Sequence, residues 1–198
     1  HAEDIITRQD IVDIVERLKK DFPIVIDEAM KVTSYGSLLK VCKDLLHEKI
    51  PIIDMLTIIE AVADIAEFTK APEILLEHVR AKLFRLITQK FKDTDGILHI
   101  VTIKPELEQQ FIGKLQEHHG VSQLMISIAE INNLVTKTKK LLDDIEAKGF
   151  SKITMVVDPV LRKRISEIYE KFGLQVSVLS HAELDSKANF AIEGTLEF

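Results

Sequence analysis

In the first half of the chain, apolar residues recur at intervals of three and four positions, which is typical of amphipathic helices. Thr7 and Asp10 have the spacing of an N-terminal capping box, so we expect a first helix to follow them. Proline is tolerated in the first turn of a helix, and Pro23 therefore predicts a second helix that reaches about Lys31. The sequence then predicts a turn at Ser34-Tyr35-Gly36.

The next apolar repeats predict three more helices in succession. A helix expected over residues 37–48 is stopped by Pro51, because proline pushes the preceding residue out of the helical conformation. Asp54 is placed to cap a helix that runs to Phe68, and Pro72 begins a longer helix to about Phe91. In the helix after Asp54, most of four apolar residues are expected in the core: Leu56, Ile58, Ile59 and Val62. Several short-linked helices without an intervening strand pattern indicate an all-helical bundle.

After the polar stretch Lys92–Gly96, the hydrophobic period changes. Residues 97–103 alternate and are rich in β-branched side chains, which predicts a strand. Pro105 is expected to open a helix toward His118, and Ser122 to begin a long helix that Gly149 closes. The remaining expected elements are a strand over 153–157, a helix over 158–172, and strands over 175–179 and 190–196.

This order of elements predicts an α/β layer with some parallel pairing and an edge hairpin. The expected fold class is therefore α+β or mixed, with an N-terminal all-helical bundle followed by a small α/β subdomain. We place the bundle at residues 1–92 and the α/β subdomain at residues 93–198.

Composition narrows the choice of function. The chain has 198 residues, a formal net charge of -6 and no basic tract, so nucleic acid is not an expected partner. The single Cys42 cannot form an intrachain disulfide and reads as a small buried apolar residue. No apolar run approaches the roughly 18 residues of a membrane span. A chain that opens with His1, without a methionine or a signal-peptide pattern, is expected to be a fragment of a longer protein.

Sequence motifs for catalysis are absent, and we expect neither a catalytic residue nor a bound metal or cofactor. His118 and His119 are adjacent, and neighbours on a helix point about 100° apart, so a solvated helix end is expected there. Ser180, His181 and Asp185 resemble a catalytic triad in residue type only, because neighbours on a strand face opposite sides.

Two features could instead contact a partner. Glu60 and Asp64 share a helix face at spacing i, i+4, which fits a solvated surface or a partner contact. The turn Pro51-Ile52-Ile53-Asp54 places branched residues beside a rigid proline, which fits either packing between the flanking helices or an apolar lip offered to a neighbouring subunit or cargo.

The segment Leu45–Asp64, with its leucine pair, Glu48, Pro51 and Asp54, resembles a stretch of the large membrane subunit of the flagellar and type III secretion export apparatus, the FHIPEP family. Three further segments share the resemblance: Ile6–Asp10, Ser37–Val41 and Val178–Leu184. Ile53 is a departure, since the family usually has arginine at this position.

The resemblance implies a cytoplasmic fragment of an export-gate subunit at the bacterial inner membrane. Such a fragment would form a ring with its own copies and would receive chaperone–cargo complexes and other export components, without catalysing a reaction. The alternative is a small-molecule-binding or catalytic α/β module with a helical cap. Its best support is the strand-to-helix turn at Val157-Asp158-Pro159, a place where open α/β sheets often bind ligands.

Overall fold

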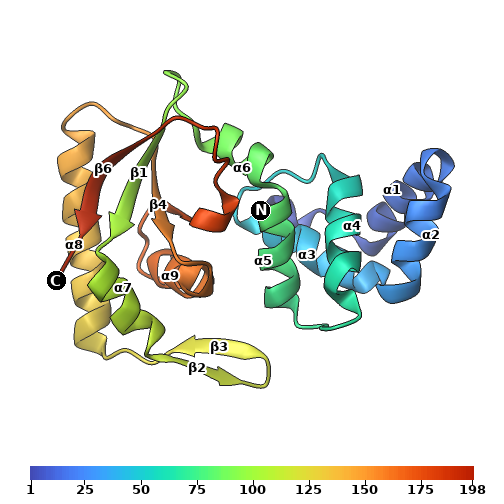
Figure 1. Cartoon of the computed structure of the whole chain (residues 1–198), viewed down its shortest axis with the longest axis horizontal. Helices are drawn as coiled ribbons and strands as arrows, with labels where there is room; N and C mark the ends of the chain where they lie inside the picture. Colours follow the sequence, from blue (N-terminus) through green and yellow to red (C-terminus); the bar gives the residue numbers. More distant parts are fainter. The chain divides into compact units, whose positions relative to one another are not determined.

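The computed structural model describes residues 1–198, and the chain divides into two compact units, His1–Leu83 and Phe84–Phe198 (Figure 1). The first unit is helical and the second contains the sheets, so the expected mixed fold class is confirmed. The division lies before the eight-residue helix Phe84–Phe91, whereas the sequence placed it after that helix, between residues 92 and 93.

The first unit is a helical bundle with an apolar core. Its elements are η1 (Ala2–Asp4), α1 (Arg8–Asp21), α2 (Pro23–Val32), α3 (Tyr35–His47), α4 (Met55–Ala66) and α5 (Pro72–Lys82). Ile58, Ile59 and Val62 are fully buried, and Leu56 is half-buried, as expected for the core face of α4.

Side chains that accept backbone N–H groups define the helix starts. The hydroxyl of Thr7 accepts the amide of Asp10, and the Asp10 carboxylate accepts the amide of Thr7 at 2.7 Å, which confirms the capping box. Asp54 caps α4 as predicted, by accepting the amide of Thr57 at 3.2 Å. The predicted turn at residues 34–36 is wrong, because Ser34 accepts the amide of Ser37 and thereby starts α3 at Tyr35.

The single helix expected from Pro72 to about Phe91 is interrupted at Leu83, whose φ and ψ are −84° and 16°. The second piece, α6 (Phe84–Phe91), belongs with the α/β unit. The hydroxyl of Thr88 donates to the carbonyl of Glu183 at 3.2 Å and accepts the amide of Asp185 at 2.9 Å. These long-range hydrogen bonds explain why α6 goes with the second unit, and no local pattern encodes them.

The second unit is built on a parallel sheet. Its other elements are β1 (Leu98–Ile103), α7 (Pro105–Ile112), β2 (Leu115–His118), β3 (Val121–Leu124), α8 (Ile128–Glu146), β4 (Ile153–Val157), α9 (Pro159–Lys171), β5 (Ser177–Ser180), η2 (His181–Glu183) and β6 (Phe190–Leu196). The strand order is β5-β4-β1-β6, and all three pairings are parallel. The helix α8 contacts β6, whereas α9 contacts β4 and β5 (Figure 1).

The expected hairpin of the last two strands is wrong, because β5 and β6 lie at opposite edges of the sheet. After β5, the amide of Ser180 donates to the carboxylate of Glu183, and the chain turns into η2 instead of a tight hairpin. The following segment crosses to the far edge, where Phe190 pairs with Leu98 in parallel.

A separate hairpin replaces part of the two helices expected around His118 and Ser122. α7 ends at Ile112, and β2 and β3 then pair antiparallel around His119 and Gly120. Both turn residues have positive φ, 53° and 78°, which is the conformation of a two-residue type I′ turn. His118 therefore ends a strand and His119 occupies a turn, and neither forms the expected helix end.

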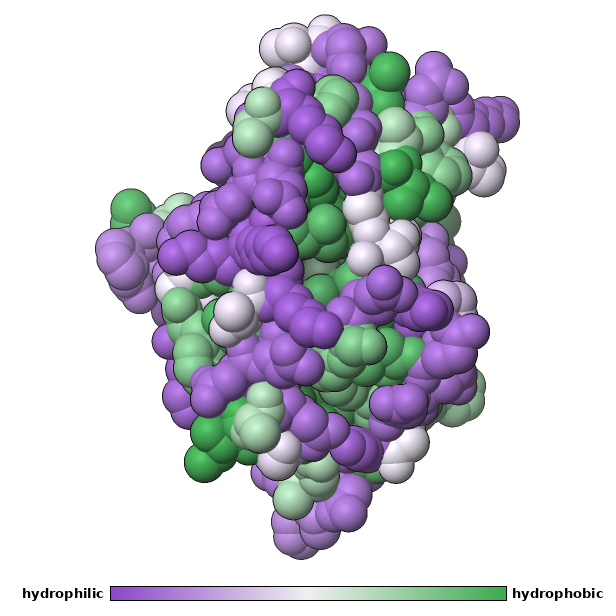
Figure 2. Space-filling model, turned by 90° about the vertical axis from the view of Figure 1, so that its left-hand side faces the viewer, coloured by the Kyte–Doolittle hydropathy of each residue, from purple (hydrophilic) through white to green (hydrophobic).

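On the face that carries α8 and the C-terminus, apolar side chains reach the surface among hydrophilic ones (Figure 2). Phe190 and Ile192 on the edge strand β6 are more than half exposed. Scattered exposed apolar residues are normal for a protein surface, so these two by themselves do not define a site.

Candidate functional site

The turn before α4 combines one buried and one exposed isoleucine. Ile50 is 0% exposed, Pro51 and Ile52 are half-buried, and Ile53 is 82% exposed. Asp54 is exposed and is engaged in capping α4. The turn is thus both a packed corner and a surface feature, and Ile53 is its most exposed apolar side chain.

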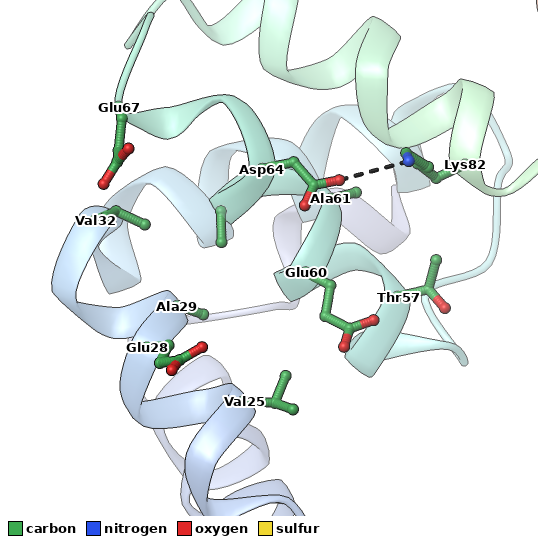
Figure 3. Close-up of a pocket in the computed structure, with 11 residues that line it drawn as sticks. Val25, Glu28, Ala29, Val32, Thr57, Glu60, Ala61, Asp64, Glu67 and Lys82 are labelled. Carbon is green, nitrogen blue, oxygen red and sulfur yellow. Dashed lines mark ion pairs between the residues drawn. The ribbon is translucent and has the colours of Figure 1, made fainter.

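A groove runs between α2 and α4 in the first unit, with a volume of about 600 Å³ (Figure 3). Small or branched apolar side chains form much of its lining: Val25, Ala29 and Val32 from α2, and Ala61 and Ala63 from α4. Four carboxylates also line it: Glu28 from α2, Glu60 and Asp64 from α4, and Glu67, the capping residue after the end of α4. An apolar floor with acidic side chains at its rim is suited to binding a partner that is both apolar and basic.

Only one of these four carboxylates forms an ion pair within the chain. An oxygen of Asp64 lies 3.5 Å from the ammonium of Lys82 and 3.4 Å from Nε2 of His78. Glu28, Glu60 and Glu67 are exposed and have no such partner. The groove therefore carries more negative charge than its own residues neutralise.

The structure brings Glu60 and Asp64 to one groove, as their spacing on a helix predicted. The residues of the Pro51 turn do not line the groove. Thr57, whose amide is capped by Asp54, does line it, so α4 connects the two features. Sequence reasoning missed Glu28, because it reaches the groove only through the packing of α2 against α4.

The strand-to-helix turn at Asp158-Pro159 does not provide an open anion site. The amide of Asp158 donates to the carboxylate of Glu108 at 2.7 Å, and the amide of Val160 donates to Asp158 itself at 3.0 Å. These contacts place the protein's own carboxylates on the donors that an anionic ligand would use. The small-molecule alternative loses its best structural support here.

Other candidate chemical groups also have structural roles. The amide of Ser180 is bonded to Glu183, and His181 lies 3.7 Å from Asp158, so Ser180, His181 and Asp185 do not form a triad. Cys42 is fully buried, and burial raises the pKa of its thiol to about 12, which disfavours the reactive thiolate.

His99 forms a buried charged cluster that sequence reasoning missed. Its Nδ1 lies 2.7 Å from Glu193 and its Nε2 lies 2.8 Å from Asp95, while its ring packs on Phe150. Both nitrogens can donate to carboxylates only in the protonated imidazolium. The hydrogen bond to Glu193, together with the one to Asp95, outweighs burial and raises the pKa of His99. The cluster ties the loop before β1 to the edge strand β6.

The chain thus combines a helical unit, which carries an acidic groove and an exposed apolar corner, with a parallel-sheet unit. The model of the FHIPEP family matches residues 1–189, and the chain belongs to this family. None of its helices is both long enough and apolar enough to span a membrane.

The relatives are proteins of flagellar biosynthesis. The chain is 40% identical over 197 residues to the flagellar biosynthesis protein FlhA of Helicobacter pylori, which covers 99% of the chain and 27% of that protein. It is 27% identical over 200 residues to FlhA of Bacillus subtilis, covering 100% of the chain and 29% of that protein. The chain therefore spans between a quarter and a third of the length of these relatives.

Solved structures share the fold at lower identity. The C-terminal domain of InvA superposes with a TM-score of 0.87 at 22% identity, over 98% of the chain and 59% of that domain. The nonameric EPEC SctV-C superposes with a TM-score of 0.85 at 19% identity, over 98% of this chain and 58% of that chain. The structure of Chlamydia pneumoniae CdsV in its complex with CdsO superposes with a TM-score of 0.85 at 19% identity, over 99% of this chain and 57% of that chain.

Proposed function

We propose that this chain is the cytoplasmic part of a flagellar protein-export subunit, and that it works as a docking and ring-forming platform. The identity to FlhA along almost the whole chain supports the flagellar assignment. In this proposal the chain lies at the cytoplasmic face of the bacterial inner membrane, and the full-length protein is embedded in that membrane.

The proposed partners are copies of the same chain, other export-apparatus subunits and chaperone–cargo complexes. Self-association is supported by the nonameric state of SctV-C, and a contact with an export component is supported by the complex of CdsV with CdsO. The proposed work is docking and handover, without bond chemistry. The capped start of α9 and the buried Cys42 favour this reading over the catalytic alternative.

The observation that carries the docking proposal is the exposure of Ile53, at 82%, on a corner that Pro51 and the Asp54 cap hold rigid. A branched apolar side chain gains little in water and is stabilised by burial against another surface. The FHIPEP family usually has arginine at this position. A contact surface accommodates an exchange of arginine for isoleucine more readily than a buried ion pair does. We therefore place Pro51, Ile52, Ile53 and Asp54 in a subunit or partner contact.

The test introduces Ile53→Asp and Ile53→Arg separately into the full-length protein. Ile53→Asp should weaken self-association and export-dependent motility, because it places a charge on an apolar contact, whereas Ile53→Arg restores the family residue and should be milder. Ile128→Asp is the matched control, since Ile128 is also an exposed isoleucine, at 78%, and belongs to α8 of the second unit. Unchanged melting, self-association and motility in both Ile53 variants would show that the turn is only a structural corner.

A further inference from the structure

The floor of the groove between α2 and α4 is lined by small side chains, which allow another helix to approach closely. Ala29 and Ala61 are buried beneath it and Ala63 is half-buried. Helix axes approach more closely where the side chains at the contact are small. Val25 and Val32 border the alanines with further apolar surface (Figure 3). A third helix laid along this floor would bury its own apolar stripe without displacing a large side chain.

The acidic rim has a regular spacing. Glu60 and Asp64 on α4 and Glu67, its capping residue in the helical conformation, follow one another at i, i+4 and i+7, a length of about 10 Å at the helical rise of 1.5 Å per residue. Glu28 adds a carboxylate from α2 (Figure 3). Like charges at this spacing repel each other, so the row is mildly unfavourable until cations approach it.

One carboxylate of this rim already forms an ion pair with a lysine of the same chain. The ammonium of Lys82 approaches Asp64 at 3.5 Å, and both side chains remain about half exposed. Glu60 and Glu67 are the neighbours of Asp64 in the row and have no cation of their own. A helix with basic residues at matching intervals would place one beside each of them.

We propose that this groove binds a basic amphipathic helix of a partner protein, whose narrow apolar stripe packs on the alanines while Lys or Arg residues spaced i, i+4 and i+7 face Glu60, Asp64 and Glu67. The proposal deepens the docking function and rests on it, and charge complementarity determines the kind of occupant. The same acidic rim disfavours acidic segments, which gives the surface selectivity as well as affinity.

The test measures binding of a synthetic helical peptide of about five turns, carrying an alanine and leucine stripe flanked by lysines at i, i+4 and i+7. The peptide is labelled with fluorescein, and its fluorescence anisotropy is titrated with the whole 198-residue chain. A matched peptide replaces the lysines with glutamine. The lysine peptide should bind more tightly, and its affinity should fall as the salt concentration rises, because the contacts are exposed and screened.

Variants locate the binding site. Glu60→Gln combined with Glu67→Gln should weaken the lysine peptide roughly fivefold or more, since each exposed ion pair contributes modestly. Glu16→Gln combined with Asp21→Asn on α1 makes the same change of net charge outside the groove and should alter affinity less than twofold. Ala63→Phe fills the groove without changing charge and should weaken both peptides. Melting curves establish that each variant is folded.

Three results would overturn the inference. Equal losses in the groove variant and the α1 variant would show non-specific attraction. Absence of binding by the folded wild-type chain would show that the groove is not a helix site, while the Ile53 experiment would still decide the docking function independently. A loss of self-association in the Glu60 and Glu67 variant, measured by sedimentation velocity, would assign the groove to a second copy of the chain instead.

Discussion

At the scale of single residues, the environments of Ile53 and Ile58 show how sharply burial changes across the start of α4. Ile53 is 82% exposed and Ile58 is 0% exposed. The Asp54 cap fixes the phase of the helix, and that phase turns Ile58 into the core. Identical side chains therefore lie in different environments: Ile58 contributes to stability, whereas Ile53 is the side chain that we propose contacts another molecule.

Truncating Ile58 to alanine should lower the free energy of unfolding by about 2–5 kcal/mol, because it removes buried methyl groups and leaves a cavity. Leu56→Ala should cost less, since Leu56 is only half-buried. Urea denaturation of the two variants beside the wild type measures the difference. Equal and negligible losses would mean that this face of α4 is not core.

The His99 cluster predicts a pH dependence of stability. The pKa of His99 in the folded chain is raised above its ordinary value of 6.5. Its stabilising contribution is therefore fully present below about pH 6.5 and is lost as pH rises through the higher folded-state pKa. Glu193→Gln should weaken this dependence, because it removes the first carboxylate that raises the pKa.

Denaturant melts between pH 5 and pH 9 test whether stability falls as pH rises. The loss of stability of the wild type over this range should exceed that of the Glu193→Gln variant. Parallel profiles would show that His99 is not held as an imidazolium.

At the scale of elements, local chemistry sets helix starts. Ser127 accepts the amide of Glu130, whose carboxylate accepts the amide of Ser127 at 2.8 Å and also pairs with Lys114. The hydrogen bond from Lys114, with those from Ser127, lowers the pKa of Glu130 to about 2. This arrangement fixes where the 19-residue helix α8 begins.

Ser127→Ala should destabilise the chain by about 1 kcal/mol, the usual cost of losing an N-terminal cap. Thermal melting at neutral pH measures it. Ser151→Ala is the control, because Ser151 is exposed and lies outside every helix and strand. A loss of equal size in the control would argue against a capping role.

Features that depend on neighbouring residues could be predicted from the sequence, whereas features that depend on long-range contacts could not. The caps at Thr7 and Asp54, the spans of β4 and β6 and the shared face of Glu60 and Asp64 follow from spacing alone. The β2–β3 hairpin was missed, because a His-Gly pair is an uncommon signal for a type I′ turn.

Other features need tertiary contacts and could not be read from the sequence. Glu28 enters the groove only when α2 packs on α4. His99 meets Glu193, 94 positions away, beside an irregularity in the register between β1 and β6. Such pairings depend on strand order, which the hydrophobic pattern of each strand does not specify.

At the scale of the whole molecule, the division into two units assigns α6 to the sheet. A fragment of residues 84–198 should unfold with one cooperative transition, whereas a fragment of residues 93–198 should be clearly less stable. The shorter fragment lacks Thr88, which bonds the backbone at Glu183 and Asp185, so η2 loses its support.

Circular dichroism melts of the two fragments measure this difference, and Thr88→Val in the longer one isolates the hydroxyl. Indistinguishable melts of the two fragments would place the boundary after α6, where the sequence suggested.

The parallel pairing of β1 with β6 also constrains the order of events during synthesis. Thr102 on β1 and Thr195 on β6 touch across 93 positions of sequence, and such long-range contacts slow folding. While the ribosome is still making the residues before β6, the nascent chain already contains β1 with one edge unpaired. An open strand edge is a template for association with other chains. The bundle of the first unit can fold as it emerges, whereas the open edge of β1 remains available for association with other chains until β6 has been made.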